Sequence, residues 1–231
     1  MIRIYPFIFI LLWSSAFITT KPIVDNSDPF SALAFRFFFV ALGFYVFSIY
    51  TKQKLIVNQK NLIESVLSGV LFHGFYLGGV FYSISIGMPT GIAALIVTLQ
   101  PILTNALSGP ILGEKVTNKQ WTGVLLGFTG AVLVLGLDIG SNIPILGLLA
   151  TIVALISITA STIWQKKLSN NLPLSVSNFY QAIGGCLFHV LIVIFFADIS
   201  INFTKSFLIA MGHQIFLVSF GAFTILMFLI K

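Results

Sequence analysis

Charged and imidazole side chains stand at only a few places inside the long apolar runs of this chain. Arg36 is the most costly, because an arginine within a membrane span costs about 2.5–3.5 kcal/mol on insertion scales. His73 and Tyr76 are three residues apart, a spacing that places both on one face of a helix. An imidazole on that face can bind a polar solute or relay a proton, or it can simply donate to a backbone carbonyl.

Thr98, Pro101 and Asn105 fall on one helical stripe, at spacings of three and four. A proline removes one backbone hydrogen bond and frees a carbonyl, which in a transport pathway exposes polar backbone to a cavity. We expect these three residues to line such a cavity. The alternative is a kink whose freed groups are satisfied by a neighbouring helix.

Two further groups are candidates for opposite walls of the same pathway. They are Trp13, Ser14 and Phe17 near the N-terminus, and Ser157 and Ser161 in the second half of the chain. Serine hydroxyls can instead bond back to their own helix, so a structural role stays open for all three serines.

Arg36 itself has two interpretations. Its long stem can carry the charge to the membrane interface or pair it with Asp25 or Asp28, which is a structural role. Alternatively, it is a cation that faces the solute. No other charged residue stands so deep in an apolar run.

Catalysis finds no support in the sequence. It contains no HExxH, G-x-S-x-G or Walker motif, and no carboxylate stands in the middle of an apolar run to act as an acid or a base. The single cysteine, Cys186, excludes a thiolate metal site and a disulfide framework. We therefore expect neither an enzyme nor a bound metal or cofactor.

The elements that hold these residues are membrane spans. Hydrophobic residues make up 58% of the 231 residues and charged residues 8%, against about 25% charged in a soluble domain. The runs are continuously apolar, which favours helices over barrel strands. We predict an all-α integral membrane protein with about eight spans, near residues 4–20, 30–50, 62–85, 88–112, 121–137, 143–164, 174–197 and 207–230.

The basic residues predict the orientation. With the N-terminus in the cytoplasm, nine fall in cytoplasmic segments and only Lys21 and Lys205 fall outside. The nine are Arg3, Lys52, Lys54, Lys60, Lys115, Lys119, Lys166, Lys167 and Lys231. We expect a multi-pass protein of the cell (inner) membrane with both termini in the cytoplasm. The net charge of +6 is scattered between spans, so no nucleic-acid partner is expected.

An internal repeat is also visible. The stretch from Trp13 aligns with the stretch from Ile158 at an offset of 144–145 residues, which sets Lys21 beside Lys166. Five spans separate the copies, and an odd number inverts the second copy in the membrane. Residues 1–140 are predicted as a first five-helix repeat and residues 141–231 as an incomplete second one of about three helices.

Three stretches resemble the EamA-like branch of the drug/metabolite transporter superfamily. They are LLWSSAFITTKPIV running into DPFSALAFRFFFVALG, then GIAALIVTLQPILTNAL, and GEKVTNKQWTGVLLGFTGAVLVL from Gly113 to Leu135. The resemblance implies ten helices in two inverted repeats that move small metabolites. At the repeat offset Lys231 pairs with Gly87, so the last two helices of that pattern are expected to be missing.

The predicted function is a secondary transporter, an exporter of small organic metabolites such as amino acids, working by alternating access. Its partners would be membrane lipids and a small-molecule solute, and a homodimer is left open. The alternative is a non-transporting helical scaffold or an inactive truncated fragment. A lipid flippase is a third, weaker hypothesis.

Overall fold

The computed structural model describes residues 4–113, 116–135, 143–168, 172–197 and 199–229. Within these ranges the chain is helical, and the one bridge between extended residues joins Ser27 to Ile201. The elements in chain order are α1 (Tyr5–Val24), α2 (Pro29–Tyr50), α3 (Gln59–Gly69), η2 (Val70–Tyr76), α4 (Leu77–Ser85), α5 (Thr90–Val97), α6 (Gln100–Leu112), α7 (Asn118–Leu135), α8 (Ile145–Leu168), α9 (Leu174–Phe196), α10 (Lys205–His213), η3 (Gln214–Ala222) and α11 (Phe223–Leu229). The elements η2 and η3 are π-helical segments inside longer helices.

Among the described residues, seven stretches of helix are long and apolar enough to cross a membrane, which confirms a polytopic helical membrane protein. The predicted span 121–137 is also helical, as α7, but it is not among the seven. Its first turn is polar, with Asn118, Lys119 and Gln120, and residues 136–137 lie outside the described part of the chain.

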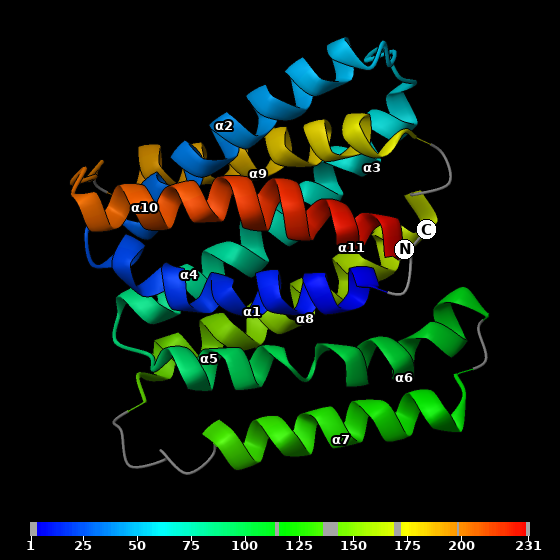
Figure 1. The fold of residues 1–231 in the computed structure, drawn as a ribbon. Coiled ribbons are helices and arrows are strands. Elements are labelled where there is room, and N and C mark those ends of the chain that lie inside the picture. The colour runs from blue at the N-terminus through cyan, green and yellow to red at the C-terminus, as the bar shows by residue number, and fades with distance from the viewer. Residues whose placement is uncertain (1–3, 114–115, 136–142, 169–171, 198, 230–231) are drawn as a thin grey trace.

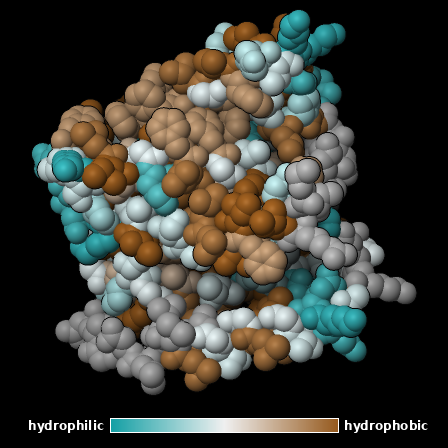
Figure 2. All heavy atoms as spheres, in the orientation of Figure 1, coloured by the Kyte–Doolittle hydropathy of each residue, from teal (hydrophilic) through white to brown (hydrophobic). Residues whose placement is uncertain are grey.

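The helices lie roughly parallel or antiparallel to one another in one bundle (Figure 1). Helix α2 packs along α9, and α1 packs along the helix formed by α10, η3 and α11. Helix α8 packs against η2 and α4, while α5, α6 and α7 form one edge of the bundle. Apolar side chains cover the middle of the face shown in Figure 2, and hydrophilic ones gather towards the ends of the helices.

Helix starts follow local capping chemistry. The Asp28 carboxylate accepts a hydrogen bond from the backbone N–H of Ser31 at 2.7 Å, and Pro29 opens α2. The Asn58 side chain caps α3 in the same way at 2.8 Å. Side-chain acceptors at these positions satisfy backbone donors that have no partner inside the helix. These caps fix where the spans begin.

Helix bounds in the two parts of the chain match at an offset of 144 residues. The offset carries the start of η2 at Val70 to the start of η3 at Gln214, and the start of α2 at Pro29 to within one residue of the start of α9 at Leu174. Helices α1 and α8 finish at opposite ends of the bundle, whereas α1 begins and α11 finishes at the same end (Figure 1).

The crossing of α3 and α9 brings two backbones into contact. A Cβ atom added to Gly69 would lie 2.1 Å from the carbonyl oxygen of Gln181, and one added to Gly184 would lie 2.3 Å from that of Val66. Only a residue without a side chain fits at such distances, so these two glycines permit the crossing.

Candidate functional site

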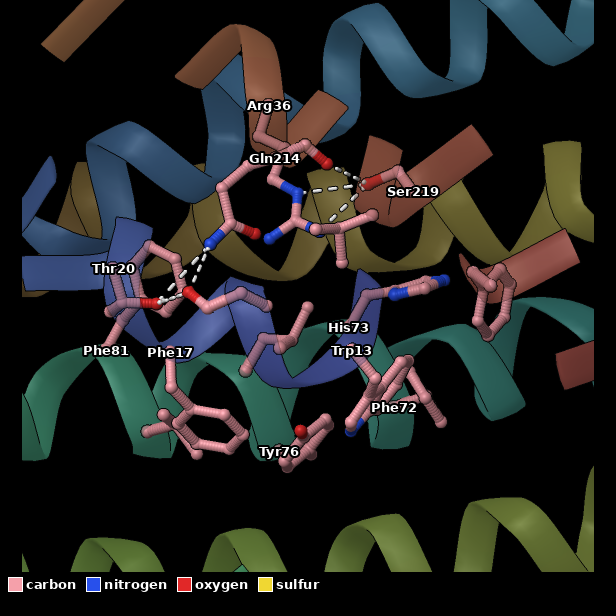
Figure 3. Close-up of a pocket in the computed structure, with 15 residues that line it drawn as sticks. Trp13, Phe17, Thr20, Arg36, Phe72, His73, Tyr76, Phe81, Gln214 and Ser219 are labelled. Atoms are coloured by element: carbon pink, nitrogen blue, oxygen red, sulfur yellow. Dashed lines mark hydrogen bonds between the residues drawn. The ribbon is translucent and has the colours of Figure 1, made fainter. Parts of the chain in front are cut away.

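Two cavities lie on either side of α1. The first has a volume of about 30 Å³ and is lined from α1, α2, η2, α4, η3 and α11 (Figure 3). The second has a volume of about 890 Å³ and is lined mainly from α1, α5, α6, α7 and α8. We call them the small cavity and the wide cavity. Trp13 and Phe17 line both, so these two side chains form the wall between them.

The two π-helical segments supply much of the small cavity's lining. Segment η2 contributes Phe72, His73 and Tyr76, and segment η3 contributes Gln214, Val218 and Ser219. The Ser219 hydroxyl donates back to the carbonyl oxygen of Gln214, five residues earlier, at 3.1 Å. Such wide turns are rare and are often found at functional sites.

Arg36 reaches the small cavity from α2 and is only 2% exposed. Its Nε and Nη2 atoms both donate to Ser219 Oγ, at 3.0 and 2.9 Å, as the dashed lines in Figure 3 show. Its guanidinium carbon also lies 5.3 Å from the centre of the Phe37 ring, within the range of a cation–π contact.

This placement corrects two details of the structural interpretation of Arg36, the membrane interface and the aspartate partners, and leaves a structural role through Ser219 open. The side chain does not extend to the membrane interface, because it is buried. It pairs with neither aspartate: Asp25 pairs with Lys21, and Asp28 caps α2. The cation turns inward because Ser219 offers it an acceptor in the bundle.

Three polar atoms of the small cavity's lining residues are buried without a hydrogen-bond partner among the described residues. They are Arg36 Nη1, Gln214 Oε1 and His73 Nδ1. The amide nitrogen of Gln214 is occupied, since it donates to the Ala16 carbonyl at 2.8 Å and to Thr19 Oγ1 at 2.9 Å. An unmade bond at a buried polar group costs about 1–3 kcal/mol, more for a charged group. The small cavity therefore offers groups that a polar ligand would satisfy.

Aromatic rings surround the two predicted residues of η2. The Tyr76 ring stacks on Trp13 at 6.4 Å between centroids, and the His73 ring lies 4.4 Å from that of Phe37. The backbone carbonyl of His73 accepts a 2.8 Å bond from Nε2 of His189, on α9. Both His73 and Tyr76 line the small cavity.

The wide cavity is lined by Ser14 and by the stripe predicted around Pro101. The span is interrupted between the end of α5 at Val97 and the start of α6 at Gln100, so Pro101 stands in the first turn of a new helix. Thr98 and Asn105 both line the cavity, and the Thr98 hydroxyl donates to the Leu95 carbonyl at 2.6 Å.

Ser157 and Ser161 lie on a different side of α8 from the wall predicted for them. Ser161 donates to the Ser68 carbonyl at 3.1 Å and accepts from Gln165 at 3.2 Å, and Ser157 is buried. The α8 residues that line the wide cavity are Ile158 and Thr162. Each follows a predicted serine by one position, which is about 100° of rotation around a helix of 3.6 residues per turn.

Sequence reasoning missed Gln214 and Ser219. A glutamine inside an apolar span is itself costly. Gln214 could therefore have been identified from the sequence as a candidate site residue, as Arg36 was. Ser219 carried none, because its role depends on a residue 183 positions away. In the described ranges, no cluster of three or more His, Cys, Asp or Glu residues could hold a metal ion.

Comparisons with known proteins place these features in a family. Residues 3–136 match the EamA-like transporter family. The "Probable amino-acid metabolite efflux pump" of Escherichia coli K12 is 26% identical over 163 residues, which cover 70% of this chain and 52% of that protein. The "Uncharacterized transporter YvbV" of Bacillus subtilis is 23% identical, covering 92% of this chain and 73% of its own length.

A solved crystal structure shares the fold, with a TM-score of 0.79 and 21% identity over all of this chain and 79% of that one. The chain spans about half the length of the E. coli relative. The match to residues 3–136 covers more than half of the chain, and it includes both Arg36 and the Pro101 stripe. The chain belongs to the EamA-like transporter family.

Proposed function

We propose that this protein is a secondary transporter that exports small organic metabolites, amino acids among them, across the cell membrane. The observation that carries the proposal is the wide cavity of about 890 Å³, lined by polar side chains beside a broken helix, in a chain of a transporter family. Cavities of about 300–1,000 Å³ are typical of sites for small molecules. The amino-acid class follows the printed name of the E. coli relative.

The proposed mechanism is alternating access between two inverted halves, residues 1–140 and 141–231. The matching helix bounds at an offset of 144 residues and the opposite directions of α1 and α8 support it. Trp13 and Phe17, which separate the two cavities, would be the gate. In the proposed orientation both termini are cytoplasmic, and a relative from E. coli is named an inner membrane transporter.

The proposal is tested by flux into liposomes that contain the purified protein. We expect saturable uptake of at least one labelled compound from a panel of amino acids and related metabolites. Thr98→Val should lower that flux because it removes a hydroxyl from the wide cavity. Thr129→Val is the matched control, since Thr129 is exposed on α7 and donates only to its own helix at Leu125.

Protein-free liposomes set the background of this measurement. If no compound gives flux above that background, the transport proposal fails and a non-transporting scaffold or inactive fragment becomes the better explanation. Equal flux through both threonine variants would remove the wide cavity from the pathway.

A further inference from the structure

We propose that the small cavity is a carboxylate-binding subsite, in which Arg36 holds the anionic end of the solute. The inference rests on the proposed transport function and adds to it the chemical group that is recognised. It is carried by a buried cation, its partner Ser219 and the unfilled space beside them.

Among the described residues, no acidic side chain pairs with Arg36. Its bonded partner is the neutral hydroxyl of Ser219, and the ion pair between Lys21 and Asp25 is exposed. A buried charge is stabilised when it is paired and hydrogen-bonded. An anion that entered the small cavity would supply that pairing.

The geometry of the guanidinium leaves one edge for a ligand. Ser219 Oγ accepts hydrogen bonds from Nε and Nη2, which form one edge of the planar guanidinium group. Nη1 has no partner in the part of the chain that the structure describes, so the edge made by Nη1 and Nη2 is open to a second acceptor. A carboxylate matches such an edge with two parallel N–H···O bonds.

The unpartnered acceptor next to this cation adds selectivity. Gln214 is 1% exposed, and its Oε1 atom has no donor. Its amide nitrogen is held by Ala16 and Thr19, which fixes the oxygen as the free end. An N–H group close to the carboxylate, as in an α-amino acid, would satisfy this oxygen.

The cavity volumes imply that one part of the solute lies in the small cavity and the rest in the wide cavity. About 30 Å³ has room for a small group and not for a whole metabolite. The wide cavity lies beyond Trp13 and Phe17 and is large enough for the remainder. A solute with its carboxylate on Arg36 would therefore pass between these two rings.

The first test measures the thermal stability of the purified full chain in detergent with added sodium acetate, sodium chloride or acetamide. We expect a saturable rise in melting temperature with acetate and none with acetamide at the same concentration. An equal rise with chloride would overturn the proposal in favour of an inorganic anion site. No rise with acetate would also overturn it.

The substitution Ser219→Asp tests the carboxylate subsite with a carboxylate that belongs to the protein. It gives Arg36 a carboxylate of its own, so we expect the acetate response to disappear while the protein stays folded. Ser219→Asn is the neutral control of similar size and should keep the response. Arg36→Gln should also lose it. If Arg36→Gln does not fold, Ser219→Asp still decides, because a response retained there refutes the subsite.

Flux separates this inference from the transport proposal. We expect Ser219→Asp to lower the flux of an amino acid by about tenfold or more relative to Ser219→Asn, the loss expected for a charge-assisted bond. Saturable flux that is equal in the two variants would refute the carboxylate subsite but would still support the transport proposal. A rise in melting temperature with acetate, without any flux, would support the carboxylate subsite and refute the transport proposal.

Discussion

Glycine has different roles in two regions of the bundle. One region is the crossing of α3 with α9, and the other is the edge formed by α5, α6 and α7. At the crossing, Gly69 and Gly184 let two backbones touch. On α7, Gly123 and Gly127 have the four-residue spacing typical of close helix packing, yet a Cβ atom added to either would meet nothing within 4 Å. Both line the wide cavity instead. A glycine pair therefore marks either a tight contact or an open space, and the neighbouring helix decides which.

The difference also separates stability from transport. The packed region contains buried hydrogen bonds between α3, α8 and α9, such as Gln165 to Gln181 at 2.9 Å. The open region contains the wide cavity and the break at Pro101. We expect substitutions in the packed region to alter folding and those in the open region to alter flux.

Gly184→Ala should give the largest effect on stability. The added methyl group would meet the Val66 carbonyl oxygen, so α3 and α9 must move apart. Overpacking of this kind costs about 1–3 kcal/mol and sometimes more. Gly127→Ala, in open space, should leave stability unchanged or raise it by about 0.5–1 kcal/mol. Melting temperatures in detergent measure both, and equal losses in the two variants would contradict the contrast.

Two neighbouring residues on α8 sharpen the comparison further. Ser161→Ala removes bonds to Ser68 and Gln165 and should cost about 1 kcal/mol of stability while flux is retained. Thr162→Val faces the wide cavity and should lower flux with little change in stability. Melting temperature and liposome flux are measured for both variants. The reverse pattern would restore the cavity wall first predicted at Ser157 and Ser161.

Lys21→Ala should give the smallest effect. Its ion pair with Asp25 is exposed, and pairs of this kind contribute about 0–1 kcal/mol. We expect a change in melting temperature near the error of the measurement and unchanged flux. A drop as large as that of Gly184→Ala would show that the α1–α2 turn carries more of the stability than its contacts indicate.

Local rules were enough to predict the spans and the break in one of them. Continuous apolar runs predicted eight spans, of which seven are long apolar helices in the described part of the chain, and the kink predicted at Pro101 lies within a few residues of the break between α5 and α6. Thr98, at that break, and Asn105, in α6, both line the wide cavity. Each of these features depends on neighbours within a few positions.

The remaining features depend on distant contacts. Arg36 finds its acceptor at Ser219 because η3 packs beside α2, and nothing close to Arg36 in sequence indicates this. Whether Ser161 or Thr162 faces the cavity depends on the rotation of α8 about its axis. The sequence does not predict this rotation, because α8 has apolar residues on all sides. The environment of a glycine likewise depends on which helix lies opposite.

The two π-helical segments carry a consequence for the history of the chain. A π turn closes its hydrogen bonds over one more residue than an α turn, so it represents an added residue within a span. Segments η2 and η3 start 144 residues apart, at matching positions of the proposed halves. If those halves arose by gene duplication, the wide turn was already present in the single ancestral unit.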